Sequence, residues 1–293
     1  MDDRTTAFEA QRGLLFAIAY RMLGTVQEAE DAVQDAWLRW HSAEAAEVIS
    51  PKGFLTTVVT RLCVDRLRSA RARRETYVGP WLPEPSAAHD PLDLESLSFA
   101  VLVLLETLSP LERAVYVLHQ VLDYSHAEIA ELMGKTPEAV RQALHRAREH
   151  VRARRPRFAP SREAHARVLA SFVQAVAAGD EAALRSLLTN DVVAVGDGGG
   201  VVPGAGRKPI RGVDNVTRLF LALGRQTAGL EARFVDLNGW PSLVMVRDGT
   251  PLLAMSIETD GDRIFVVYDV VNPAKLARLP VESPPAPTPA APE

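Results

Sequence analysis

Apolar side chains in the first part of the chain recur every three or four residues, which is the period of an α-helix with one buried face. Two such stretches, residues 8–23 and 26–40, predict helices separated at Gly24, and a third helix is predicted to begin at Pro51. Apolar residues return at the same period over 93–156. The first half of the chain is therefore predicted to be all-helical.

A helix-turn-helix is predicted over residues 124–152. Its first helix, 124–133, ends at Gly134, because glycine readily adopts the left-handed backbone that closes a helix. Thr136 offers a hydroxyl oxygen as cap for the next helix, and Pro137 stands in its first turn, where no backbone N–H is needed. Ser109 and Pro110 predict the start of an earlier supporting helix in the same way.

The second helix of this motif carries two different faces. Its apolar stripe is predicted to pack, whereas its polar residues form a cationic surface beside that stripe. The apolar residues are Val140, Leu144, Ala147 and Val151; the polar ones are Arg141, Gln142, His145, Arg146 and Arg148. Such a surface suits reading of the DNA major groove. The alternative is an ordinary amphipathic helix with a solvated basic side.

Residues 73–92 contain four prolines and are predicted to be a linker, since proline interrupts a helix. Within this linker lies an unusually apolar pentapeptide, formed by Trp81, Leu82, Pro83, Glu84 and Pro85. Adjacent tryptophan and leucine side chains are not expected in a linker that is fully exposed to water. We therefore interpret the pentapeptide as a docking peptide, with a merely adhesive linker as the alternative.

The pattern changes after Pro160, where helices give way to strands of alternating polarity. Predicted helices cover 164–178, 181–188 and 213–227, and predicted strands cover 231–237, 243–247, 252–258 and 264–271. This order predicts an α+β domain over 162–276, with a curved antiparallel sheet and a pocket between its layers. The last fourteen residues, 280–293, include six prolines and are expected to be disordered.

Charge is segregated along the chain, although the formal net charge is only −4 over 293 residues. Residues 61–74 hold six arginines and one aspartate, and residues 141–157 hold seven arginines and one glutamate. Residues 28–47 instead hold six acids and one arginine. Two basic surfaces and one acidic surface are therefore predicted as separate contact regions.

The remaining composition excludes several classes of function. Cys63 is the single cysteine, so an intramolecular disulfide or a thiolate zinc site is excluded, and the seven histidines lack metal-ligand spacing. No signal peptide is visible, and no stretch approaches 18 uninterrupted apolar residues. We expect a reduced, cytoplasmic protein that holds no metal and needs no cofactor.

Three signatures in order make residues 5–155 resemble an extracytoplasmic-function sigma factor of bacterial RNA polymerase. They are the stretch 30–37 (EDAVQDAW), the stretch 51–55 (PKGFL) leading to 64–68 (VDRLR), and the stretch 108–113 (LSPLER) with the helix-turn-helix. The resemblance implies a region-2 domain at 5–72, the linker at 73–92 and a region-4 domain at 93–156. It also implies core RNA polymerase and promoter DNA as partners.

The resemblance assigns candidate residues to each partner. The acidic helix would dock on the polymerase through Asp31, Gln34, Asp35 and Leu38. The arginine-rich segment would engage the minus-ten promoter element through Arg61, Arg66, Arg68, Arg71, Arg73 and Arg74, although many members of the family carry asparagine where Arg61 stands. The second helix of the helix-turn-helix would read the minus-thirty-five element through Arg141, Gln142, His145, Arg146 and Arg148.

Residues 162–276 resemble a SnoaL-like domain, whose cone-shaped fold is shared with nuclear transport factor 2 and ketosteroid isomerase. The hallmarks are the pentapeptide at 81–85, a glycine loop and a late helix start. The glycine loop is Asp197, Gly198, Gly199 and Gly200, followed by Val201 where relatives have lysine. The late motif is Asn272 and Pro273, followed by Ala274 where relatives have aspartate. The resemblance implies that this domain modulates the sigma factor in cis.

A competing interpretation treats the last domain as an enzyme or a small-molecule sensor. Its candidate carboxylates are Asp191, Asp197, Asp236 and Asp269, and His165 is on its first helix. Asp197 precedes three glycines and is better interpreted as a turn residue than as a general base, so we expect no enzymatic activity. A possible small-molecule ligand of the domain stays open, and a ligand-responsive helix-turn-helix regulator is the alternative for the whole chain.

Overall fold

The computed structural model describes residues 3–43, 50–75, 77–87, 98–152, 160–203 and 205–279, with the backbone alone over 70–75. The predicted tail at 280–293 lies outside these residues, as do 88–92 of the predicted linker and both ends of the 93–156 segment. The chain divides into two compact units. Met1–Glu84 with Ala88–Arg157 form the first unit, and Pro85–Ala87 with Phe158–Glu293 form the second.

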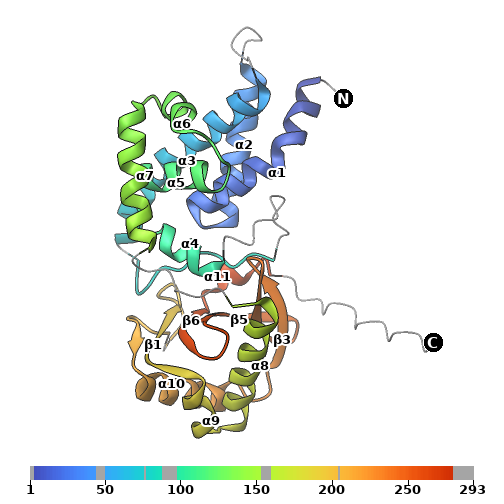
Figure 1. The fold of residues 1–293 in the computed structure, drawn as a ribbon. Coiled ribbons are helices and arrows are strands. Elements are labelled where there is room, and N and C mark those ends of the chain that lie inside the picture. Colours follow the sequence, from blue (N-terminus) through green and yellow to red (C-terminus); the bar gives the residue numbers. More distant parts are fainter. Residues whose placement is uncertain are drawn as a thin grey trace, which may run out of the picture. The chain divides into compact units, whose positions relative to one another are not determined.

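The first unit begins with three long helices, α1 (Asp3–Leu23), α2 (Val26–Ser42) and α3 (Pro51–Glu75) (Figure 1). Helix α1 starts five residues before the predicted position. Its first turn is held by α2, because Trp40 Nε1 donates to the carbonyl of Arg4 at 3.0 Å and Arg4 Nη1 donates to the carbonyl of Trp40 at 3.2 Å. Helix α3 runs on to Glu75, so its backbone extends into the predicted linker.

Four shorter helices follow among the described residues of the first unit, namely α4 (Phe99–Leu105), α5 (Pro110–Gln120), α6 (His126–Met133) and α7 (Pro137–Arg152). The predicted caps at Ser109 and Thr136 are confirmed, and Gly134 ends α6 in the left-handed conformation. The predicted start of α6 at Tyr124 is wrong. Ser125 caps that helix instead, in a reciprocal capping box with Glu128.

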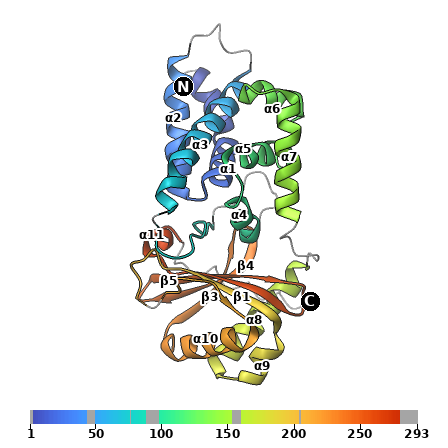
Figure 2. The ribbon, with the colours of Figure 1, turned by 90° about the vertical axis from the view of Figure 1, so that its left-hand side faces the viewer.

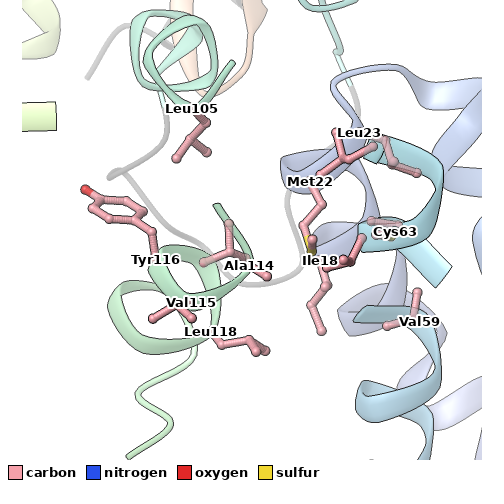
Figure 3. Close-up of a cluster of buried hydrophobic side chains, with 14 of the residues drawn as sticks. Ile18, Met22, Leu23, Val59, Cys63, Leu105, Ala114, Val115, Tyr116 and Leu118 are labelled. Atoms are coloured by element: carbon pink, nitrogen blue, oxygen red, sulfur yellow. The ribbon is translucent and has the colours of Figure 1, made fainter. Parts of the chain in front are cut away.

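A single hydrophobic core joins the two groups of helices in this unit. Figure 3 shows Ile18 and Met22 of α1 and Cys63 of α3 opposite Ala114 and Leu118 of α5. All five of these side chains are fully buried. The helices predicted as two domains therefore pack as one body in the first unit.

The second unit is an α+β fold built on a six-stranded sheet. Its helices are α8 (Arg162–Ala178), α9 (Glu181–Ser186), α10 (Val213–Gln226) and α11 (Pro273–Leu276). Its strands are β1 (Leu188–Asp197), β2 (Ile210–Arg211), β3 (Glu231–Leu237), β4 (Trp240–Arg247), β5 (Thr250–Thr259) and β6 (Ile264–Val270). Helices α8, α9 and α10 cover one face of the sheet, and α11 lies on its other side (Figure 2).

The strand order is β2-β1-β6-β5-β4-β3, with β1 parallel to β6 and the other neighbours antiparallel. The sheet is therefore mixed, which corrects the predicted antiparallel sheet. The prediction also lacked β1 and β2, and it extended α9 to Leu188, which is the first residue of β1. Strand β1 was missed because its pairing partner β6 lies about 70 residues later, and local patterning carries no trace of such a partner.

Candidate functional site

The acidic face of α2 is exposed as a continuous strip. Asp31, Gln34 and Leu38 are all exposed, and Leu38 keeps 58% of its surface accessible. The opposite face is held in the core by Ala32 and Ala36, both fully buried. Positions three, four and seven residues apart lie on one side of a helix, so the predicted polymerase-binding residues are brought together.

Asp35 differs from its neighbours because it is already paired. Its Oδ2 lies 2.6 Å from Nη2 of Arg66 on α3, and Arg66 Nη1 donates to the carbonyl of Glu28 at 2.9 Å. The carboxylate and the guanidinium are 45% and 26% exposed. A residue predicted to bind polymerase and one predicted to bind DNA thus share an ion pair that the sequence did not indicate.

The other predicted minus-ten residues lie along α3. Arg61 Nε donates to the carbonyl of Leu132 on α6 at 3.1 Å, which links α3 to the helix-turn-helix. Arg68 is exposed and paired with Asp65 at 3.1 Å, one helical turn away. Arg71, Arg73 and Arg74 lie on the backbone of α3, and their side chains are outside the described part of the chain. The described arginines are thus spread along one helix.

Helix α7 presents the predicted minus-thirty-five surface to solvent. Its apolar stripe is buried as predicted, and the polar residues are exposed. The exposed residues are Arg141, Gln142, His145, Arg146 and Arg148. Two of them are tethered: Arg141 to Glu138 at 2.5 Å, and Arg146 to Glu112 of α5 at 2.8 Å.

Glu112 was not predicted as part of this surface. Burial opposes its ionisation, but hydrogen bonds from Arg146 and Ser109 outweigh burial and hold the pKa of Glu112 below its ordinary value. Its carboxylate therefore stays charged and positions Arg146 on α7. The capping box at Ser109 was the sequence signal for Glu112, although it indicated a helix start and not this contact.

The linker pentapeptide is docked within the first unit through its glutamate. Glu84 is 4% exposed; its backbone N–H donates to the carbonyl of Gly24 at 2.8 Å, and its carbonyl accepts from the Tyr20 hydroxyl at 2.6 Å. The Glu84 carboxylate accepts from the N–H of Val26 at 2.9 Å, at the start of α2. A carboxylate at a helix N-terminus is stabilised by the free N–H groups there.

Trp81 and Leu82 complete this docking. Leu82 is 1% exposed, and the Trp81 ring lies against Gly24. Gly24 has a φ of 78°, and a Cβ there would come within 2.7 Å of the Trp81 ring and 2.8 Å of Glu106 Oε1. Only glycine fits between the linker and α4 at this point.

Glu106 extends the contact into the core of the same unit. It forms an ion pair with Arg113, whose side chain is 2% exposed, and Arg113 Nε donates to the carbonyl of Arg21 at 2.9 Å. The docked pentapeptide thereby touches a buried network that joins α1, α4 and α5. The next linker residues belong to the second unit, where Ser86 and Asn238 exchange hydrogen bonds of 3.2 and 2.8 Å.

In the second unit, the glycine loop and the late motif meet at Asp197. The Asp197 side chain is fully buried; Oδ1 accepts from the N–H of Gly199 at 3.0 Å, and Oδ2 lies 2.7 Å from Nζ of Lys275. The Asp197 carbonyl accepts from Val271 and Asn272. Asp197 is the last residue of β1, and its side chain accepts from the glycine loop that follows, whereas the ion pair with Lys275 was not predicted.

Asn272 links the glycine loop to the start of α11. Its Oδ1 accepts from the N–H of Ala274 at 3.1 Å and caps α11, with Pro273 as the first helical residue. Gly199, at a φ of 62°, packs so closely that a Cβ would lie 2.5 Å from Asn272 Nδ2. Gly198 and Gly200 flank it in the same turn. The two motifs thus form one structural element around the buried side chain of Asp197.

The remaining candidate groups of the second unit have different surroundings. Asp191 is exposed, Asp236 is paired with Arg162, and Asp269 is 7% exposed with its pKa raised by burial to about 7. His165 Nε2 lies 3.0 Å from the Pro241 carbonyl, and burial lowers its pKa. Across the described ranges, no cluster of three or more metal-ligating side chains is found, and no helix is long and apolar enough to traverse a bilayer.

Two family models match the first unit. Sigma-70 region 2 matches residues 7–73, and Sigma-70 region 4 matches residues 98–151. These matches cover α1–α3 and α4–α7, including the acidic face and the helix-turn-helix described above. The fold and its surfaces therefore define a sigma factor of RNA polymerase.

Comparison with individual proteins narrows this class. The chain is 39% identical over 295 residues to the ECF RNA polymerase sigma factor SigJ of Mycobacterium tuberculosis (strain ATCC 25618 / H37Rv), covering 94% of each chain. It is 33% identical over 216 residues to the probable ECF RNA polymerase sigma factor SigI of M. tuberculosis (strain CDC 1551 / Oshkosh), covering 70% of this chain and 74% of the relative. The crystal structure of M. tuberculosis SigJ superposes with a TM-score of 0.76 at 34% identity, covering 95% of this chain and all of that chain. The chain belongs to the extracytoplasmic-function family of RNA polymerase sigma factors.

Family membership decides between the two functions considered from the sequence. The protein is a sigma factor whose partners are core RNA polymerase and promoter DNA. The chain therefore belongs to the sigma factors, and not to the generic helix-turn-helix regulators considered as the alternative. The predicted architecture, two helical sigma domains followed by an α+β domain, is confirmed.

Proposed function

We propose that the exposed strip of α2 is the surface by which this sigma factor grips core polymerase, with Asp31, Gln34 and Leu38 in contact and Asp35 beside them. The supporting observation is that an apolar residue, Leu38, stays 58% exposed between acidic and polar neighbours. An exposed large apolar side chain within a charged surface is typical of a protein contact. The paired Asp35 contributes by positioning Arg66.

Alanine substitution of Asp31 and Leu38 tests this surface. Binding to core polymerase is expected to weaken at least tenfold, while the helical circular dichroism stays unchanged because both side chains point to solvent. The matched control is Glu9→Ala, which removes an exposed acid of α1 that is only weakly paired with Arg12 at 3.6 Å. Equal affinity of the double variant and the control would remove this surface from the polymerase contact.

We further propose that the described arrangement of the first unit is a closed state that opens when the promoter is bound. The minus-ten and minus-thirty-five elements are about 25 base pairs apart, or about 85 Å at about 3.4 Å per base pair. A compact unit of about 150 residues has a radius of gyration of only about 15 Å. Helices α3 and α7, which share one core, do not reach both elements until that core separates.

The docked linker is the proposed control of this opening. Glu84 is bound to the turn between α1 and α2, while Trp81 and Glu106 meet at Gly24. The linker thereby adds contacts to the closed state that an opened state loses. Because Pro85–Ala87 belong to the second unit, the linker is the proposed means by which the α+β domain modulates the sigma domains in cis.

Gly24→Ala tests the linker role, with Gly239→Ala as the matched control. Both glycines have a positive φ, 78° and 77°, but only a Cβ at Gly24 meets Trp81 and Glu106. Weakening the docking of the linker by about 1–2 kcal/mol is expected to favour the opened state, and so to raise the promoter affinity of the complex with core polymerase by about 5- to 30-fold at most. In vitro transcription with core polymerase should then exceed that of the control. Identical output from both variants, and from residues 1–160, would reject regulation in cis.

We propose a second role for the α+β unit, the binding of a small molecule. The supporting feature is an apolar pocket of about 230 Å³ between α8, α10 and the sheet. Pockets lined by apolar side chains in a layered fold are the usual sites of small ligands. The test is a thermal-shift screen of the full chain against a fragment library, in which some fragments should raise the melting temperature. This stabilisation should be lost in Ala177→Trp, which fills the pocket.

A further inference from the structure

The pocket of the second unit is almost entirely apolar. Its walls are Phe172 and Val176 of α8, Phe220 of α10, and Leu243 and Met255 of the sheet. Phe172 and Phe220 meet edge to face, with ring centroids 5.0 Å apart. Among the described residues that line it, none is ionisable and only Thr227 has a polar side chain, whose hydroxyl donates to the carbonyl of Leu223 at 2.9 Å. The lining by itself selects a neutral, apolar ligand.

A buried carboxyl group lies on the same face of the sheet, one strand away. Asp269 of β6 is directly opposite Met255 of β5, and directly opposite residues of an antiparallel pair share a face with their Cβ atoms about 5 Å apart. The pair two residues away along each strand, Val267 and Ile257, is also directly opposed and belongs to the core under the helices, which places Asp269 and Met255 on the same helix-covered face. Asp269 is therefore the neighbour of Met255 on this face, one strand beyond the lining of the pocket.

The Asp269 carboxyl is not satisfied by the protein around it. The side chain is 7% exposed, and Oδ1 has no hydrogen-bond partner within the described part of the chain. Burial alone raises the pKa of this carboxyl to about 7. An unpaired buried polar atom is costly, and an apolar residue would serve the packing better at this position. A group that brings a hydrogen bond to Oδ1 would relieve this cost.

We infer that the pocket binds a neutral, mainly apolar molecule of about two rings whose one hydroxyl group forms a hydrogen bond with Asp269. An apolar cavity of about 150 Å³ accommodates benzene, so 230 Å³ accommodates a two-ring body. A hydroxyl donates to the ionised carboxylate and accepts from the protonated acid, so it suits both states. This inference rests on the proposed ligand role and specifies its chemistry.

The test uses 2-naphthol and naphthalene, which differ by the hydroxyl alone. Isothermal titration with the full chain is expected to show 2-naphthol binding at least tenfold more tightly than naphthalene. Asp269→Val removes the acceptor and keeps a strand-favouring side chain, so it should abolish this preference and leave naphthalene binding unchanged. Asp269→Asn retains an acceptor oxygen and should restore most of the preference.

Two control variants test whether the compounds bind in this pocket. Asp191→Val changes an exposed aspartate of β1 and should leave the affinities for both compounds unchanged. Ala177→Trp fills the pocket and should prevent binding of both compounds. Equal affinity for the two compounds in the natural chain, or a preference that survives in Asp269→Val, would overturn the role of Asp269. Absence of binding by both compounds would overturn the pocket as their site. Binding without any change in transcription would uphold the site and reject only its regulatory use.

Discussion

Lys275 Nζ lies 2.7 Å from Oδ2 of Asp197, and this ion pair joins two motifs that are 78 residues apart. The two side chains are 8% and 0% exposed. Removing one partner from a buried pair leaves a charge without compensation, whereas removing both is far less harmful. The pair therefore secures the glycine loop to α11.

Lys275→Met is expected to destabilise the second unit by about 3–5 kcal/mol, because Asp197 is then buried without its partner. Hydrogen exchange of the amides at Gly199 and Asn272, both bonded to Asp197, should accelerate most. The double variant Asp197→Asn with Lys275→Met should recover much of the loss. Lys208→Met, at an exposed lysine, serves as the control and should exchange as the natural protein does.

Arg148→Ala is expected to weaken promoter binding. It should also lower the magnitude of the negative slope of log affinity against log salt concentration by about 0.9, because one phosphate contact releases about one counterion. Arg148 is exposed on α7. Arg167→Ala removes an equal charge from an exposed site on α8 and should leave the slope unchanged. The measurement is fluorescence anisotropy of labelled promoter DNA across a salt series, and a slope equal to that of the natural protein would contradict the assignment.

His165 should make the second unit sensitive to acid. Burial, reinforced by the nearby Arg162 charge and opposed by the hydrogen bond to Pro241, lowers the pKa of His165 below its ordinary value of 6.5. The unfolded chain then binds the proton more readily, so stability is complete above pH 6.5 and falls as the pH drops below it. Thermal unfolding between pH 5 and 8 should show a shallower fall for His165→Gln. The same substitution at exposed His150 should leave the profile unaltered.

Asp269 should make the stability of the second unit depend on pH in the opposite direction to His165. Its pKa is raised by burial from 3.8 to about 7, so the folded state binds the proton more readily than the unfolded state. The stability it contributes is present at low pH and is lost as the pH rises through 7. Asp269→Asn, which carries no charge at any pH, should therefore stabilise the protein more at pH 8 than at pH 5. A pH-independent difference in melting temperature would contradict the raised pKa.

Local chemistry explains which elements the sequence predicted well. Ser109, Thr136 and Gly134 act on backbone groups within four residues of themselves, so their capping roles follow from the sequence alone. The start of α6 was misplaced because Tyr124 fits the apolar pattern, whereas the Ser125 cap with Glu128 decides the boundary. The acidic face of α2 and the basic face of α7 were predicted for the same reason, since helical periodicity places those residues together.

The amino-acid sequence by itself determined the helices of the sigma domains, their caps, the charge of each face and the family to which the chain belongs. Tertiary structure alone decided that α1, α3 and α5 share a core, that Asp35 pairs with Arg66, that the linker docks at Gly24, and that Asp269 lies opposite Met255. The physical reason is the distance along the sequence over which each kind of interaction acts. Propensity, capping and periodicity act over a few residues, whereas core packing, ion pairs and strand register join residues that only the folded chain brings together.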